Sequence, residues 1–275
     1  MTFVIAEIGI NHSGSLDLAK KLIDAAKWAG ADAVKFQKRD ISICCAGRLD
    51  EPRQSPWGKT YGEYKTHLEF SRLQYDLIAS YCEEIKMPWF ASAWDIPSID
   101  FLKKYDCPWN KIASAMATNT EFVKAVAKEG KSTYLSTGMC AVEDIQNAID
   151  LLALPNITLM HTVSTYPCPE SDLNLNCIRT LRERFNLPVG YSGHEDSVSP
   201  SVVAVAIGAV AVERHITISR SMYGTDQAAS LEPNGFRQMV EMIRKVPTIL
   251  GDGVKRMAPG EDAVAKKLRY WLHNS

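Results

Sequence analysis

Short apolar runs, rich in β-branched and aromatic residues, recur along the whole chain. Such runs are typical of buried parallel strands. Eight of them are predicted as strands: Phe3–Ile8, Ala33–Phe36, Trp89–Ser92, Trp109–Ala113, Ser132–Ser136, Ile157–His161, Val189–Ser192 and Ala209–Glu213. Stretches with helical spacing of apolar residues lie between or after them: Leu16–Trp28, Ser71–Ile85, Thr120–Lys128, Val142–Leu152, Leu175–Phe185, Ser199–Gly208 and Pro233–Leu250.

This alternation of strand and helix predicts an α/β fold with parallel strands and right-handed crossovers. The chain has 275 residues, and a (β/α)8 TIM barrel usually needs about 250. A doubly wound open sheet is the alternative, but no Gly-x-Gly-x-x-Gly follows the first strand. We therefore predict one barrel domain over residues 1–275, without a linker or a second domain.

Two segments interrupt the alternation. Residues 38–70, after the second strand, lack clear periodicity but contain Trp57, Tyr61 and Tyr64. Insertions this long are usually functional, so we predict that this one closes its own site or that of a neighbour in a homodimer. A disordered surface loop is the alternative. In the tail, residues 251–275, we expect a short helix over Glu261–Leu272.

Composition narrows the choice of partners and compartment. The net charge is −1, and no basic stripe is present, which argues against nucleic acid. No apolar run approaches the roughly 20 residues that span a bilayer, and the first residues lack a secretory signal. The seven cysteines include no Cys-x-x-Cys pair. We therefore expect reduced thiols in a cytoplasmic protein that has no membrane partner.

Polar residues stand at the carboxyl ends of all the predicted strands, where barrel enzymes build their sites. In chain order they are Glu7, Lys35, Gln37, Ser92, Lys111, Ser114, Ser136, His161, Tyr166, Ser192, His194, Glu213 and His215. Each of them, taken singly, can equally be a structural residue: a solvated loop residue, a helix cap or a hydrogen-bonded histidine. Their convergence on one mouth favours a functional site.

Two lysines and four serines of this set suit an anion. Lys35 and Lys111 supply point charges, and hydroxyl donors come from Ser92, Ser114, Ser136 and Ser192. This combination fits a phosphate or a carboxylate.

The remaining residues suggest a metal ion and an acid–base group. His194 and His215, on neighbouring strands, are placed to share a divalent cation with open positions, which suits a catalytic ion such as Mn²⁺. Glu7 is a candidate for proton transfer or positioning. Glu213 is equally well explained as an internal salt-bridge partner or as a catalytic group.

Motifs along nearly the whole chain resemble the sialic acid synthase (N-acetylneuraminate synthase) family. They are Ile5–Ser15, Gly30–Gln37, Lys111–Ser114, Leu135–Met139, Tyr166–Pro167, Gly190–His194, Glu213–His215 and Gly224–Gln227. Each motif alone is modest evidence, but all of them occur in the order of the family.

The resemblance implies a transferase that condenses phosphoenolpyruvate with an open-chain N-acetylmannosamine-type aldose, giving a nonulosonic acid and phosphate. It assigns Glu7, Lys35 and His215 to catalysis, and His194 and His215 to a divalent metal, Mn²⁺ or else Mg²⁺ or Co²⁺. Positions matching Lys35, Lys111, Ser114, Ser136 and Ser192 hold phosphoenolpyruvate. Those matching Gln37, Tyr166 and Asp226 hold the sugar.

The sequence also departs from this family. Met116 replaces a glutamate that contacts the sugar, and Ser164, which we assign to the substrate site, replaces an asparagine. We expect the family's small C-terminal antifreeze-like domain to be absent, together with the arginine that it contributes. A cation from the insertion, among Arg48, Arg53 and Lys59, is a possible substitute.

Three alternatives stay open. The first is a related synthase for another aldose, such as a legionaminic or pseudaminic precursor or the precursor of a different 2-keto-3-deoxy acid. A sugar phosphate would need an extra cationic cluster near the mouth, and none is evident beyond Arg220. The second is a Schiff-base aldolase that uses Lys35 or Lys111. The third is a non-catalytic binding paralogue.

Overall fold

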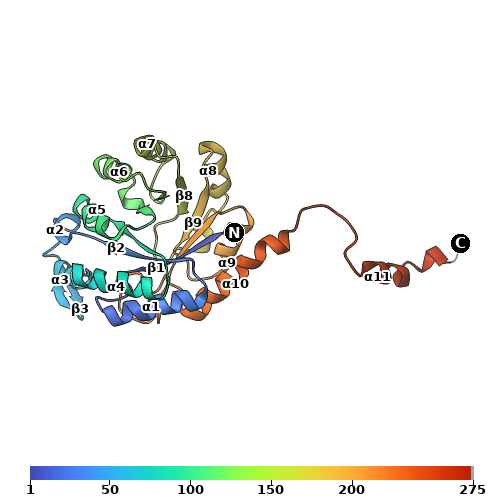
Figure 1. Cartoon of the computed structure of the whole chain (residues 1–275), viewed down its shortest axis with the longest axis horizontal. Helices are drawn as coiled ribbons and strands as arrows, with labels where there is room; N and C mark the ends of the chain where they lie inside the picture. The colour runs from blue at the N-terminus through green and yellow to red at the C-terminus, as the bar shows by residue number, and fades with distance from the viewer. Residues whose placement is uncertain (274–275) are drawn as a thin grey trace.

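Eight parallel strands close into a barrel in the computed structural model, which describes residues 1–273 (Figure 1). The strands are β1 Phe3–Gly9, β2 Ala33–Lys38, β5 Trp89–Ala93, β6 Asn110–Ile112, β7 Thr133–Ser136, β8 Ile157–Thr162, β9 Val189–Gly193 and β10 Ala211–His215. Their order around the barrel is β1-β10-β9-β8-β7-β6-β5-β2. The predicted TIM barrel is confirmed, and the open-sheet alternative is wrong.

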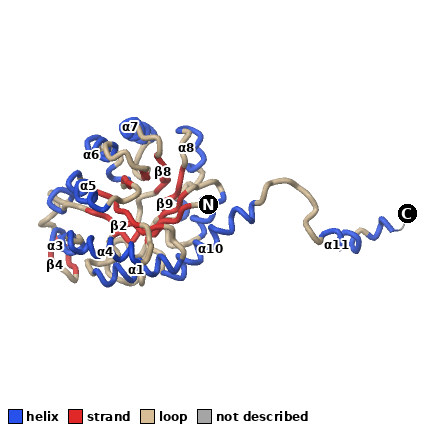
Figure 2. Tube along the Cα trace, in the orientation of Figure 1, coloured by secondary structure: helices blue, strands red, loops and turns tan. Residues whose placement is uncertain are grey.

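Helices surround the strands (Figure 2). They are α1 Leu16–Ala29, α4 Arg72–Glu84, α5 Ile96–Leu102, α6 Thr120–Ala127, α7 Val142–Leu152, α8 Cys177–Phe185, α9 Ser199–Ala206 and α10 Pro233–Leu250, with 3-10 turns at Lys103–Tyr105, Ser114–Met116 and Glu170–Asp172. α1 begins after Ser15, whose hydroxyl accepts from the Leu18 amide, and ends at Gly30 in the left-handed region.

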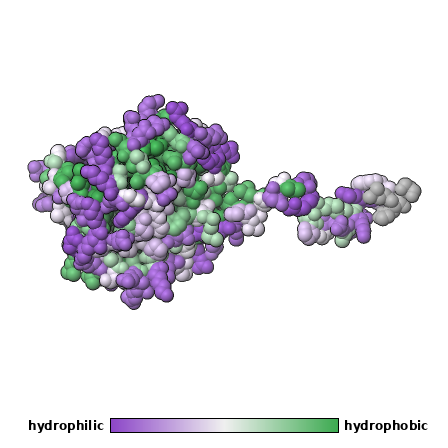
Figure 3. Space-filling model, turned by 45° about the horizontal axis from the view of Figure 1, so that its top comes forward, coloured by the Kyte–Doolittle hydropathy of each residue, from purple (hydrophilic) through white to green (hydrophobic). Residues whose placement is uncertain are grey.

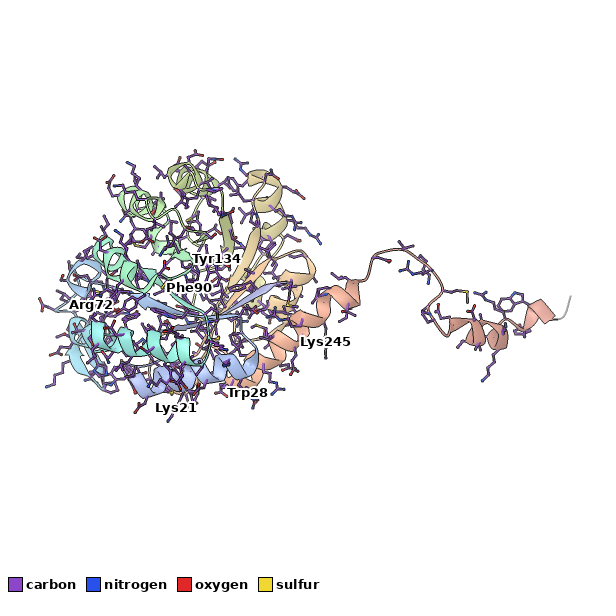
Figure 4. The ribbon with its side chains drawn as sticks, viewed as in Figure 1. Lys21, Trp28, Arg72, Phe90, Tyr134 and Lys245 are labelled. Carbon is purple, nitrogen blue, oxygen red and sulfur yellow. The ribbon has the colours of Figure 1, made fainter. Side chains whose placement is uncertain are left out.

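Aromatic side chains fill the barrel near the amino ends of its strands. Phe90 of β5 lies 6.0 Å from Tyr134 of β7 and 5.5 Å from Trp109, measured between ring centroids. Both Phe90 and Tyr134 are labelled in Figure 4. Phe3 extends the cluster, 5.0 Å from Trp109. These rings close one end of the barrel, so the polar side chains gather at the other.

The insertion after β2 is folded. It contains α2 Ile41–Cys44, an antiparallel hairpin of β3 Pro52–Ser55 and β4 Gly58–Thr60, and α3 Tyr61–Leu68. Trp57 stacks on His67 at 4.8 Å, and Tyr223 donates to the Gln54 carbonyl at 2.9 Å. The disordered-loop alternative is therefore wrong, and the insertion packs on the loop after β10.

A buried ion pair fixes the loop after β9. Arg214 of β10 is fully buried, and its guanidinium lies 2.7 Å from Glu195 and donates to Ser201 at 3.1 Å. We expect Arg214→Met to lower the free energy of unfolding by about 3–5 kcal/mol, because it leaves the Glu195 charge buried with no ion-pair partner. Urea unfolding measures this change. The double variant Arg214→Met/Glu195→Gln should recover most of the loss, and an unchanged single variant would contradict the assignment.

The C-terminal tail stands apart from the barrel (Figure 3). Its helix α11 covers Glu261–Leu268 and is followed by a 3-10 turn at Tyr270–His273. The predicted helix therefore exists but ends at Leu268 rather than Leu272. Among the described helices, none combines the length and apolar character that crossing a membrane requires.

Candidate active site

A cavity of about 270 Å³ opens at the carboxyl ends of the strands, and all eight strands contribute to its wall. It is lined by these predicted site residues: Glu7, Lys35, Gln37, Ser92, Lys111, Ser114, Ser136, Ser164, Tyr166, Ser192, His194, Glu213 and His215. Parallel strands bring their carboxyl ends to one mouth, which is why residues far apart in sequence meet here.

Two buried lysine–glutamate pairs form the floor of the cavity. The Lys35 ammonium lies 2.6 Å from Glu7 Oε2 and donates to Ser92 Oγ at 2.8 Å. The Lys111 ammonium donates to both oxygens of Glu213, at 2.8 and 2.9 Å. Both pairs are almost completely excluded from solvent.

Glu213 lies between the two lysines. Its Oε1 is 2.8 Å from Lys111 Nζ and 3.7 Å from Lys35 Nζ. Burial alone would raise the pKa of Glu213, but the two ammonium groups hold that pKa well below its usual range. Of the two interpretations of Glu213, the structure supports the internal salt-bridge partner. The two lysines therefore line the cavity, as the sequence indicated, and each of them is paired with a glutamate.

Gln37 connects this floor to the rim. Its amide nitrogen donates to Glu7 Oε1 at 2.7 Å, and its amide oxygen accepts from Arg39. Gly9 leaves room for this contact: a Cβ there would lie 3.1 Å from both Glu7 Oε1 and the His215 ring, and its φ of +55° is one that favours glycine.

Hydroxyl groups line the cavity beside this floor. Ser114 Oγ accepts from the Gly138 amide at 3.1 Å, and Ser192 Oγ lies 3.3 Å from Glu213 Oε1. A Cβ at Gly138 would approach Ser164 Oγ to 2.3 Å and Ser114 Oγ to 2.9 Å, so a larger residue there would displace these hydroxyls. Ser114, Ser164 and the 138 backbone therefore form one compact polar surface.

His194 and His215 face each other, with ring centroids 5.7 Å apart. His194 Nδ1 is 2.8 Å from the Val163 carbonyl, which fixes this nitrogen as the donor and leaves Nε2 free. Burial, and secondarily His215, lowers the pKa of His194 to about 3, so the ring is neutral. His215 Nδ1 is buried and has no hydrogen-bond partner within residues 1–273.

This pair fits a metal ion only in part. Neutral imidazoles with free nitrogens are good ligands for divalent transition metals. Within residues 1–273, however, no group of three or more His, Cys, Asp or Glu side chains is arranged for a metal. An ion held by His194 and His215 would need oxygen ligands from water or substrate, as in an open catalytic site.

Three predicted positions differ from expectation. His161 Nε2 contacts the Leu173 carbonyl at 2.7 Å, and the neighbouring Thr162 lines the cavity instead. Met116 packs against the core and does not line the cavity. Asp226 is half-buried outside the lining; burial would raise its pKa, but the charge of His215 and the Thr225 hydroxyl lower it.

Sequence reasoning missed Trp94 and Met139, which line the cavity, and Arg39, which holds Gln37. Trp94 and Met139 follow the ends of β5 and β7, so extending the search by a few residues past each strand would have found them.

Comparisons with known proteins identify the family of this chain. The model of the NeuB family matches residues 22–255. Human N-acetylneuraminate-9-phosphate synthase is 39% identical over 272 residues, covering 97% of this chain and 76% of that protein. N,N'-diacetyllegionaminic acid synthase of Campylobacter jejuni is 35% identical, covering 94% and 80%. The crystal structure of N-acetylneuraminic acid synthetase from Leptospira borgpetersenii, in complex with citrate, has a TM-score of 0.83 at 30% identity, covering 98% of this chain and 92% of that one. The chain belongs to the NeuB family.

Proposed function

We propose that the protein is a phosphoenolpyruvate-dependent transferase that makes a nonulosonic acid from an open-chain N-acetylmannosamine-type aldose. One observation carries the proposal: the Lys35–Glu7 and Lys111–Glu213 pairs lie in the same cavity as the facing rings of His194 and His215. Membership in a family whose relatives are named as sialic, legionaminic and pseudaminic acid synthases supports it.

The floor and the hydroxyl wall would bind phosphoenolpyruvate. Lys111 uses two contacts on Glu213, and an ammonium group has a third hydrogen to donate. The hydroxyls of Ser114, Ser136 and Ser192 can rotate to donate to phosphate or carboxylate oxygens. Because the phosphate is fully charged, it would be held by several donors rather than by one salt bridge.

The condensation forms one carbon–carbon bond. Carbon 3 of phosphoenolpyruvate attacks the aldehyde carbon, and the aldehyde oxygen takes up a proton to become a hydroxyl. Positive charge develops at carbon 2, where water adds and loses a proton. The bond between carbon 2 and the phosphate oxygen then breaks, and the new hydroxyl passes its remaining proton to the departing phosphate, which leaves the keto acid and free phosphate.

Glu7 is the residue best placed to assist at carbon 2. Its carboxylate is held by Lys35 and Gln37, and a fixed negative charge stabilises a developing cation in a cavity with little water. The same carboxylate can accept the proton of the attacking water. A divalent ion held by His194 and His215 would supply polarisation of the aldehyde oxygen.

A phosphate-release assay tests the proposal. Purified protein is incubated with phosphoenolpyruvate, Mn²⁺ and a panel of N-acetylmannosamine-type and diamino-trideoxy aldoses. We expect release that requires both the aldose and the metal. If none of the aldoses in the panel gave phosphate release, the proposal would be contradicted. Borohydride trapping with pyruvate would instead inactivate a Schiff-base aldolase.

A further inference from the structure

The segment after β10, residues 216–231 and called here the β10 loop, closes on itself at the carboxyl end of its strand. His215 is the last residue of β10, and its carbonyl accepts from the Leu231 amide at 2.9 Å. The Leu231 carbonyl accepts in turn from the Thr217 amide at 3.0 Å. These bonds join the start of the loop to its end, so a displacement of the loop would be passed on to His215, which lines the cavity.

Asn11, in the loop after β1, ties the β10 loop to the strand beside it. The parallel pairing of β1 with β10 ends at Glu7 and His215, and the Ile216 amide then donates to the Glu7 carbonyl at 3.0 Å. The Asn11 side chain supplies the next contact, because its Nδ2 donates to the Ile216 carbonyl at 2.9 Å. Asn11 therefore holds the β10 loop at the point where the hydrogen bonds between the strands end.

A second bond from the same nitrogen reaches the far end of the loop. Asn11 Nδ2 also donates to Ser230 Oγ at 2.8 Å, and this hydroxyl donates to the backbone carbonyl of Asp226 at 2.6 Å. Asn11 and Ser230 are both buried. The amide oxygen of Asn11 is buried without a hydrogen-bond donor within residues 1–273, so the side chain stabilises this region through its nitrogen.

Gln227 adds a second connection between the two loops. Its Nε2 donates to the backbone carbonyl of Asn11 at 3.4 Å, and its Oε1 accepts from the Thr217 hydroxyl. Gln227 and Thr217 are also buried, and a buried polar group that loses its partner is costly. Asn11, Ser230 and Gln227, called here the loop clamp, thus form one buried network that fixes the β10 loop.

The β10 loop places the Asp226 carboxylate near two residues that line the cavity. Burial, and next the charge of Asp226, raises the pKa of Tyr166. Burial would raise the pKa of Asp226 as well, but the charge of His215 lowers it. The rings of Tyr166 and His215 lie 6.3 Å apart between centroids, and both line the cavity. A shift of the loop would therefore move Asp226 relative to both rings.

We propose that the loop clamp positions the side of the cavity that receives the aldose. The three clamp residues do not line the cavity, so they act through Asp226 and His215 rather than by touching a substrate. This inference rests on the proposed function, in which phosphoenolpyruvate binds at the floor. The floor lysines, Lys35 and Lys111, are carried by β2 and β6, so loosening the β10 loop should affect the aldose and not phosphoenolpyruvate.

Ser230→Ala tests the clamp with a small change, because it cuts the link from Asn11 to Asp226 and keeps the bond to the Ile216 carbonyl. At saturating phosphoenolpyruvate, the KM for the best acceptor of the aldose panel should rise by about tenfold, as the loss of buried hydrogen bonds allows. The KM for phosphoenolpyruvate should stay unchanged. Asn11→Ala should raise the KM for the aldose further, since it removes both donated bonds. Where that variant does not fold, Gln227→Glu removes the other connecting donor and keeps the shape of the side chain.

The matched control is Ser71→Ala. Ser71 is exposed, and its hydroxyl caps α4 by accepting from the Gln74 amide at 3.4 Å, outside the cavity. This variant should lower the midpoint of thermal unfolding without changing either KM. It shows what a loss of stability alone does to the kinetics.

Hydrogen–deuterium exchange gives a readout that does not depend on turnover. We expect Ser230→Ala to speed exchange of the amides in residues 216–231 and to leave those of β5, β6 and β7 unchanged. A loop that exchanges faster while the KM for the aldose stays the same would assign the clamp to stability alone and overturn the inference. Exchange and KM that both match the unmodified protein would overturn it too.

Calorimetry with N-acetylmannosamine separates this inference from the proposed function. If no mixture releases phosphate, the proposed function is overturned and the clamp is judged by binding of this sugar. Weaker binding to Ser230→Ala than to the unmodified protein would then support the clamp, and equal affinities, or no binding to either, would overturn it. Phosphate release with an unchanged KM for the aldose in Ser230→Ala would support the reaction and overturn the clamp.

Discussion

His215→Ala is expected to lower turnover by on the order of a thousandfold, the largest loss among the changes considered. The imidazole faces His194 in the cavity, and its Nδ1 is buried with no hydrogen-bond partner among the residues that the structure describes. A divalent ion at this pair would lose one of its two protein ligands, and the aldehyde would lose its polarisation. His194→Ala should have the same effect, because the two rings act on one ion.

Two measurements check this expectation. Calorimetric titration with Mn²⁺ should show binding to the unmodified protein and much weaker binding to His215→Ala, while thermal unfolding stays nearly unchanged. His161→Gln is the matched control, because His161 is also buried at a strand end but contacts the Leu173 carbonyl instead. Full activity of His215→Ala in metal-free buffer would show that the pair holds no catalytic ion.

The barrel could be predicted from the sequence because each strand is buried and thus reads as a continuous apolar run. The ends of the strands are harder to predict from apolar runs. The last strand was predicted over Ala209–Glu213, but the observed strand covers Ala211–His215, so Arg214 and His215 lie inside it. Hydropathy does not mark such an end, because Arg214 is polar yet fully buried by its pairing with Glu195.

Two kinds of short element were missed. α5 has only 7 residues, and it depends on capping by Asp95 and on a proline in its first turn. The hairpin strand Pro52–Ser55 consists of Pro-Arg-Gln-Ser, which carries no strand pattern. Both elements are stabilised by caps, turns and contacts with distant residues, and hydropathy does not report those contacts.

The residues that line the site could be predicted from the sequence, but the pairing of its lysines with glutamates could not. Strand ends converge in any barrel, so listing polar residues at those ends found most of the lining. Lys111 and Glu213, by contrast, are 102 positions apart on strands that are not neighbours. Their pairing is made across the barrel interior, and only the closed structure shows that the floor holds two cations and two anions.

Lys111→Ala is therefore expected to affect binding of phosphoenolpyruvate through two losses. The ligand loses a charged donor, which should weaken its affinity by on the order of a hundredfold, and Glu213 loses its nearest counterion. With Lys35 left at 3.7 Å, the Glu213 carboxylate would repel the incoming phosphate. The affinity for the aldose should change far less, because Lys111 lies at the floor and we expect the sugar to bind toward the rim.

The double variant Lys111→Met/Glu213→Gln separates these two losses. It removes both charges of the pair, so the repulsion disappears while the lost donor remains, and phosphoenolpyruvate should bind better than to Lys111→Ala but worse than to the unmodified protein. Calorimetry measures all three affinities, and Lys104→Ala is the control, because that lysine is exposed and its contacts with Asp76 and Tyr105 lie outside the cavity. An unchanged affinity in Lys111→Ala would make this lysine a purely structural partner of Glu213. A double variant that binds no better than Lys111→Ala would show that the donor alone, and not the freed carboxylate, controls the affinity.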